Sequence, residues 1–165
     1  MRHVAIVVIA ASALVSGCAS TSNSAAPERD EGGVVIEAGR ENILRLRLGD
    51  CIDIATRNGI VDEVPVVPCS ESHVNQVVAV FDLSGDEYPG ESAVRRLADQ
   101  GCIDELVVAL AHREDLVDIG YSMYTPTEEL WNELGSREVL CIAGFTGRYN
   151  TTDLLDTSVT SDADN

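Results

Sequence analysis

Cys69 and His73 stand four residues apart in the stretch VPCSESH, and this pair could do two kinds of chemistry. As zinc ligands they would need two further ligands, such as Cys51 or His112, and thiols that stay reduced. As nucleophile and base they would need a free Cys69 thiolate and a third group that orients the histidine. A disulfide at Cys69 has none of these requirements. We therefore favour a disulfide and predict neither a metal nor a cofactor.

His73 has a structural and a catalytic interpretation. It follows a Ser-Glu-Ser loop and could hydrogen-bond Glu71, Asp50 or a backbone carbonyl, which would fix the turn. The alternative is a hydrolase acting on cell-wall material, with His73 and Asp50 or Glu71 as acid and base. The sequence contains no Gly-x-Ser-x-Gly, no phosphate-binding glycine loop and no His-Glu-x-x-His that would indicate another reaction.

The start of the chain is typical of an export signal. Residues 4–15 form an apolar run of twelve, which is shorter than the roughly 20 residues that a membrane-spanning helix needs. The following residues, 14–18, read LVSGC and resemble the lipobox of bacterial lipoproteins, whose cysteine becomes an acylated N-terminus. We expect residues 1–17 to be a signal peptide and Cys18 to carry the lipid. The protein would then be anchored to the extracytoplasmic face of the cell membrane.

The other four cysteines form an even set, as in a disulfide scaffold. Three pairings are possible, and we favour Cys51 with Cys69 and Cys102 with Cys141. The first bond would close a hairpin-like connection, and the second would join a helix to a late strand.

Composition divides the rest of the chain into three parts. Residues 18–34 contain the lipidated cysteine and a flexible linker of small, polar and charged residues. Residues 35–148 have the size of one domain with a single core. Residues 149–165 are predicted to be an acidic, disordered tail.

The charge is strongly negative. Of the 11 basic residues, all arginines, Arg2 leaves with the signal peptide, so 10 remain against 28 Asp and Glu and the mature charge is 10 − 28 = −18. This negative charge opposes binding to nucleic acids, and anionic lipid headgroups would repel it. We therefore expect the acyl anchor to be the contact with the membrane.

Hydrophobic patterns predict an α+β domain. Four segments have the pattern of strands. Apolar and polar residues alternate over 43–50, apolar runs occupy 64–68, which is rich in valine, and 77–83, and residues 137–145 would alternate between the two faces of a strand. From residue 91 the apolar positions recur every four residues, which predicts one main helix, and residues 125–134 begin with a capping box at Thr125 that predicts a short second helix. We expect a small mixed or antiparallel sheet, these two helices and two disulfides.

Three aromatic residues are candidates for recognition. Tyr121 and Tyr124, in the stretch GYSMYTP, are the aromatic residues that we expect to be most exposed, and with Trp131 they could form a small binding surface. Packing of Trp131 into the core is the competing interpretation.

Several motifs together resemble the actinobacterial septum formation family: LGDCID, VPCSESH, QVVAVFDL, YPGE, YTPTEELW and VLCI. The resemblance extends over about residues 46–147 and implies a link to cell division, but no reaction or cofactor. Ser72 departs from the family, whose members often have proline before the histidine.

Three classes of function remain. We favour a lipid-anchored surface domain that binds envelope or division proteins, with His73, Glu71, Tyr121, Tyr124 and Trp131 as candidate recognition residues. The alternatives are the hydrolase that uses His73 and a structural surface protein whose acidic coat matters more than any site.

Overall fold

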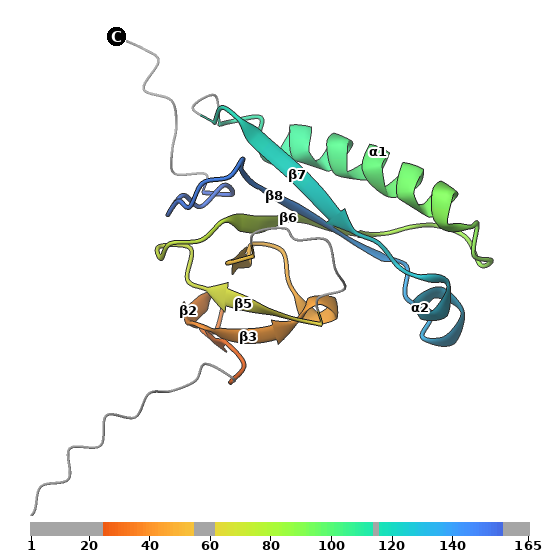
Figure 1. The fold of residues 1–165 in the computed structure, drawn as a ribbon, viewed down its shortest axis with the longest axis horizontal. Coiled ribbons are helices and arrows are strands. Elements are labelled where there is room, and N and C mark those ends of the chain that lie inside the picture. The colour runs from red at the N-terminus through yellow and green to blue at the C-terminus, as the bar shows by residue number, and fades with distance from the viewer. Residues whose placement is uncertain (1–24, 55–61, 114–115, 157–165) are drawn as a thin grey trace, which may run out of the picture.

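The structure, a computed structural model, describes residues 25–54, 62–113 and 116–156 (Figure 1). The predicted signal peptide and Cys18 lie outside the described residues, as does the last part of the predicted tail, residues 157–165. Within the described part, no helix is both long enough and apolar enough to cross a membrane.

An antiparallel sheet of six strands forms the centre of the molecule, in the order β3-β5-β4-β6-β8-β7. Its strands are β3 (Gly39–Asn42), β4 (Cys51–Ile52), β5 (Glu63–Val67), β6 (Asn75–Asp82), β7 (Ile119–Tyr124) and β8 (Glu138–Phe145). A second, two-stranded sheet pairs β1 (Glu28–Arg29) with β2 (Val35–Glu37). With helices α1 (Glu91–Ala109) and α2 (Glu128–Glu133), the predicted α+β class is confirmed.

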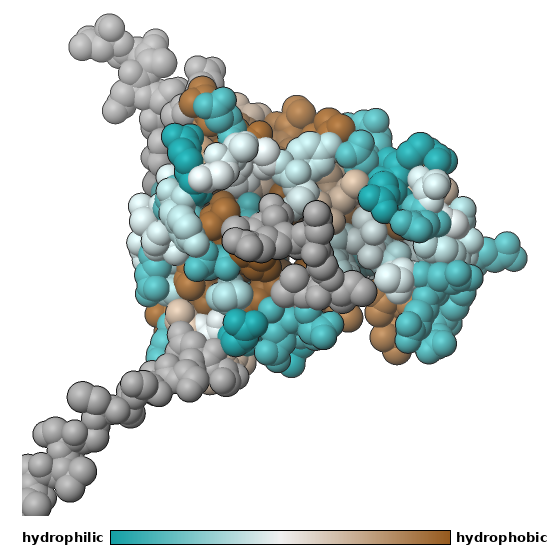
Figure 2. Space-filling model, in the orientation of Figure 1, coloured by the Kyte–Doolittle hydropathy of each residue, from teal (hydrophilic) through white to brown (hydrophobic). Residues whose placement is uncertain are grey.

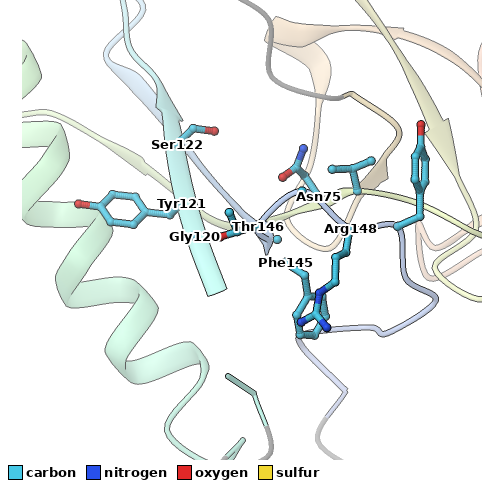
Figure 3. Close-up of a pocket in the computed structure, with 11 residues that line it drawn as sticks. Asn75, Gly120, Tyr121, Ser122, Phe145, Thr146 and Arg148 are labelled. Atoms are coloured by element: carbon cyan, nitrogen blue, oxygen red, sulfur yellow. The ribbon is translucent and has the colours of Figure 1, made fainter. Parts of the chain in front are cut away.

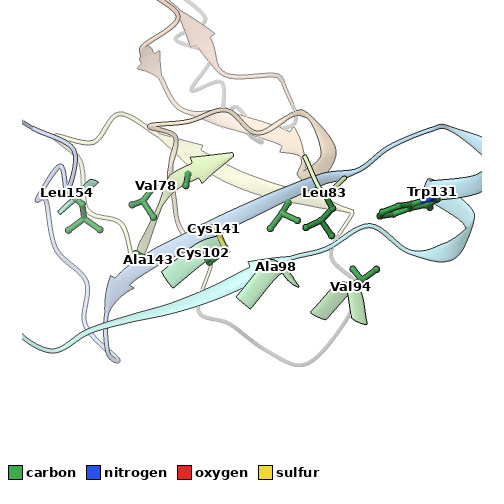
Figure 4. Close-up of a cluster of buried hydrophobic side chains, with 11 residues drawn as sticks. Val78, Leu83, Val94, Ala98, Cys102, Trp131, Cys141, Ala143 and Leu154 are labelled. Atoms are coloured by element: carbon green, nitrogen blue, oxygen red, sulfur yellow. A yellow bond between two sulfur atoms is a disulfide. The ribbon is translucent and has the colours of Figure 1, made fainter. Parts of the chain in front are cut away.

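The two longest strands, β6 and β8, lie side by side and separate two hydrophobic cores. Along β8, Cys141 and Ala143 belong to one core, and Leu140 and Ile142 to the other, as the alternation of the sequence predicts. Figure 4 shows the first core, which α1 covers. The second core lies on the opposite face of β6 and β8 and includes residues of β2, β4 and β5. Both faces of β8 are therefore buried.

Helix α1 contacts the sheet along the predicted ridge, since Val94, Ala98 and Cys102 are its buried residues. Gly101 lies against Phe81 of β6, where a Cβ atom would overlap the phenyl ring. The glycine that weakens the helix by propensity thus allows the helix and the sheet to approach each other.

Two local predictions need correction. Residues 43–50 do not form a strand: a 3-10 helix, Ile43–Arg45, begins after Asn42, whose side chain accepts from the Leu44 N–H. The Arg47 N–H donates to the Asp50 carboxylate, and such local bonds compete with sheet pairing. Helix α2 is capped by Thr127 rather than Thr125, which places Glu128 and Glu129 at the positive end of the helix dipole.

Both predicted disulfides are confirmed. Cys51 pairs with Cys69 across 18 residues, and Cys102 of α1 pairs with Cys141 of β8 across 39 residues.

The folded region is wider than the predicted domain of residues 35–148. On its N-terminal side, the Arg40 N–H donates to the Ala25 carbonyl, and Pro27 is buried. On its C-terminal side, Leu154 is 2% exposed and belongs to the core under α1. Residues 149–156 are therefore part of the domain, because Leu154 is an apolar anchor within an otherwise polar segment.

Candidate functional site

His73 is an interior residue, with 1% of its surface exposed. Its Nδ1 atom lies 2.8 Å from the Glu71 carbonyl oxygen, so Nδ1–H donates and fixes the turn, while the Glu71 side chain is exposed. The His73 backbone forms two hydrogen bonds with Asn150, both 2.9 Å long. This position suits a structural role, because substrate cannot reach the ring from solvent.

Asp50, the second candidate for acid and base chemistry, is also enclosed. It is 3% exposed, and its carboxylate accepts two bonds from Arg29, of 2.6 and 2.8 Å, and one of 2.8 Å from the Arg47 N–H. The hydrogen bond with Asp50 raises the pKa of Arg29 above its usual value. Asp50 thereby joins the turn before β4 to β1.

The predicted surface of three aromatic residues is wrong. Trp131 is 1% exposed, donates from Nε1 to the Asp86 carbonyl at 3.2 Å, and lies 3.9 Å beneath the Arg137 guanidinium. Tyr121 and Tyr124 lie on opposite faces of β7, since Tyr121 donates to Asp99 of α1 and Tyr124 packs against the second core. The three residues do not share a surface.

An open depression lies where β6 begins, β8 ends and β7 begins (Figure 3). Its volume is about 390 Å³. Asn75, Gly144 and Gly120 are directly opposite one another on the three strands, so two neighbouring positions lack a side chain and form the floor. A Cβ atom at Gly144 would overlap the Val74 carbonyl oxygen, which makes glycine a requirement of this floor.

The walls of the depression carry several polar and aromatic groups. Ser122 and Thr146 provide hydroxyls, and Tyr149 is 63% exposed. The Arg148 guanidinium lies 5.1 Å from the centre of the Phe145 ring, where cation–π contact orients it. Asn75 is held by its Nδ2–H, which donates to the Ile54 carbonyl at 2.6 Å. These groups can contact an extended polar ligand whose carboxylate forms charge-assisted hydrogen bonds with Arg148.

Sequence reasoning missed this depression. Its glycines are far apart in the chain, and only the register of three strands brings them together. Composition places Arg148 at the end of the domain and Tyr149 at the start of a tail, although both side chains are exposed in the structure and adjacent arginine and tyrosine residues are typical of recognition surfaces.

The described residues contain no group of three or more His, Cys, Asp or Glu side chains that could hold a metal ion.

The model of one protein family, described as septum formation, matches residues 38–161 of the chain. The chain belongs to the septum formation family. The matched region contains both disulfides, the depression and the C-terminal segment that carries Leu154. Membership supports a septum-related role for this family member. No curated protein and no solved structure matches the chain.

Proposed function

We propose that this septum formation protein is a binding module, displayed on the outer face of the cell membrane by acylated Cys18, and that the depression at residues 144–149 receives its partner. The observation that carries the proposal is the exposed set of Arg148 and Tyr149 around a floor of two glycines. The partner is an envelope protein that presents an extended segment with a carboxylate. Its binding, and not a reaction, is the activity.

The number of cysteines outside disulfides supports the lipid anchor. Four of the five cysteines are paired in the structure, which leaves Cys18 as the remaining one. Cys18 directly follows an apolar stretch and small residues, as the cysteine of a lipobox does. A cysteine of this kind is expected in an exported lipoprotein, where the acyl groups keep the domain at the membrane.

The geometry gives the hydrolase alternative no support. His73 is 1% exposed and Asp50 is 3% exposed, and the Nδ1 atom of His73 and the Asp50 carboxylate form bonds that hold turns. General acid and base groups must reach the reacting atoms within hydrogen-bond distance. A structural surface protein differs from a binding module in that it would tolerate every change in the depression.

A photo-crosslinking side chain in the acylated, full-length protein tests the proposal. Placed at Tyr149, it should yield one discrete adduct with an envelope protein in growing cells. Arg148→Ala in the same chain should abolish the adduct, because the partner's carboxylate loses its cation. The matched control is the same side chain at Leu134, which is 72% exposed on the end of α2. Equal adducts from both positions, or an adduct that survives Arg148→Ala, would overturn the proposed site.

A further inference from the structure

Three apolar side chains near the start of the folded region are open to solvent. Val34 is 62% exposed, Ile36 55% and Leu48 60%. Val35, which lies between the first two, is buried in the second core, so Val34 and Ile36 project from the outer side of β2. Val34 and Leu48 also line one cavity of about 180 Å³. We call Val34, Ile36 and Leu48 the β2 surface.

An arginine borders the β2 surface. Arg47 is exposed, and its guanidinium lies 3.8 Å from the position that a Cβ atom would take at Gly33, the residue before Val34. A long arginine stem can lie along apolar surface while its charged end reaches polar groups above. Apolar side chains next to an arginine are the combination that suits the boundary between acyl chains and headgroups.

The charge around this surface differs from that of the whole chain. Residues 25–48 contain four arginines and five acidic residues, a balance of 4 − 5 = −1. The rest of the mature chain has 10 − 4 = 6 arginines against 28 − 5 = 23 acidic residues. An anionic bilayer therefore repels residues 25–48 far less than it repels the rest of the mature chain taken together.

The tether leaves the domain beside the β2 surface. Ala25, the first described residue, accepts a hydrogen bond from Arg40, and Glu28 pairs with Glu37 at the end of β2. Ala25 is seven positions after Cys18, and seven steps of extended chain span at most about 25 Å. The domain is thus kept within this distance of the lipid.

We propose that the β2 surface rests on the lipid bilayer, with Val34, Ile36 and Leu48 among the upper acyl chains and Arg47 at the headgroups. The proposal rests on the membrane display proposed above. Three side chains are a weak contact by themselves, but a short tether gives a weak contact a high effective concentration. Helix α1 lies on the far side of the sheet from β2 (Figure 1), so this arrangement turns α1 away from the membrane.

The experiment couples the full mature chain through Cys18 to a maleimide lipid, since the other four cysteines are in disulfides. Vesicles contain phosphatidylcholine and phosphatidylglycerol, with bromine atoms on the acyl chains. Leu48→Trp reports on the β2 surface. Leu134→Trp is the control, because α2 and β2 lie at opposite ends of the long axis (Figure 1). Trp131 is 1% exposed in the unsubstituted protein, and its emission, measured with that protein, is subtracted.

The proposal expects the emission of Leu48→Trp to shift to the blue and to be quenched by the brominated lipid, while Leu134→Trp changes little. Adding Val34→Glu and Ile36→Glu should remove the quenching. Equal quenching of the two tryptophans, or none, overturns the proposal, as does a blue shift without vesicles, which would show that a second copy covers the surface. Because the lipid is attached chemically, the result does not depend on natural acylation or on the crosslink at Tyr149.

Discussion

Gln76 connects three parts of the chain through one buried side chain. It is 1% exposed, and its Nε2 group donates to the Gly49 carbonyl at 3.2 Å and to Asp153 Oδ1 at 2.7 Å. Its Oε1 atom accepts from the Leu154 N–H at 2.6 Å. The amide therefore bonds to two backbone groups, one of them the buried Leu154 N–H, and it holds the C-terminal segment against β6.

Replacing this amide by a hydrocarbon should destabilise the protein. Gln76→Leu keeps the size of the side chain but leaves the buried Leu154 N–H and the Gly49 carbonyl without this partner. We expect the free energy of unfolding in urea to fall by about 1–3 kcal/mol. Gln100→Leu is the control, because Gln100 is exposed on α1 and bonds to Asp104 within the helix. A loss of the same size in both variants would contradict the role given to Gln76.

Glu138 and Asp82 are like charges placed directly opposite each other on β8 and β6. Burial, and then the charge of Asp82, raises the pKa of Glu138 above 4.5. The folded state therefore holds the proton more tightly than the unfolded chain, so this residue favours folding at acidic pH and opposes it as the pH rises through the folded pKa.

Glu138→Gln should accordingly stabilise the protein at pH 7, by about 0.2–1 kcal/mol, and the gain should shrink as the pH falls below the folded pKa. Urea unfolding at several pH values measures this difference. Asp82→Asn should stabilise similarly, and the double variant should gain less than the sum. Strictly additive gains would show that the two carboxylates do not interact.

At the level of single residues, the sequence is a good guide to covalent partners and a poor one to sites. The cysteine pairing follows from the even number of cysteines after Cys18 and from their spacing, and the structure confirms it. The depression depends on Gly120 and Gly144 being cross-strand partners, which no local pattern contains. The burial of Trp131 and His73 likewise depends on distant segments, namely the loop at Asp86 and the strand-like contact of Asn150.

The two disulfides join different pairs of elements, and their cysteines differ in exposure to solvent. Cys102 and Cys141 are both 0% exposed beneath α1, whereas Cys69 is half-buried in the loop after β5. By the entropy of the closed loops, of 18 and 39 residues, they contribute about 3 and about 4 kcal/mol respectively. Both contributions are large for a domain of this size.

Mild reduction should therefore open Cys51–Cys69 first, because thiol exchange needs access to a sulfur atom. A small thiol, followed by alkylation and peptide mapping, should label Cys51 and Cys69 while Cys102 and Cys141 remain linked. Adding denaturant should make the two disulfides equally easy to reduce. Earlier labelling of Cys102 in the native protein would contradict the assigned burial.

Elements with a regular period are the ones that the sequence predicts well. The ridge of α1 and the alternation of β8 each determine their buried faces locally, and the structure has both. Residues 43–50 show the limit of this reasoning: they alternate like a strand, but the Asn42 and Asp50 side chains bond to the backbone and replace the sheet partner. Short strands such as β1 and β4, of two residues each, carry no period at all.

The surface of the molecule is mainly hydrophilic on the face shown in Figure 2, with separate apolar patches between polar ones. The C-terminal segment completes the core under α1. Arg113 donates to the Asp153 carbonyl at 2.8 Å, and Leu154 fills the end of the α1 core. Stability thus depends on residues that composition alone assigns to a solvated tail.

Truncation measures this dependence. A chain that ends at residue 156 should unfold at nearly the same urea concentration as the full chain. A chain that ends at residue 148 should be far less stable, because it loses the burial of Leu154 and the bonds to Gln76 and Arg113. Leu154→Ala in the full chain should cost about 2–5 kcal/mol, which isolates the part due to the side chain. Equal stability of the two truncated chains would contradict the packing.

The place of Leu154 also determines when the domain can finish folding. A polypeptide is synthesised, and translocated, from its N-terminus, yet the core under α1 stays open until residue 154 arrives beside β6 and β8. In the proposed export of this chain, the residues before Leu154 would therefore wait in an incomplete state. The early Cys51–Cys69 crosslink can form in that interval, and the last residues to emerge then close the domain.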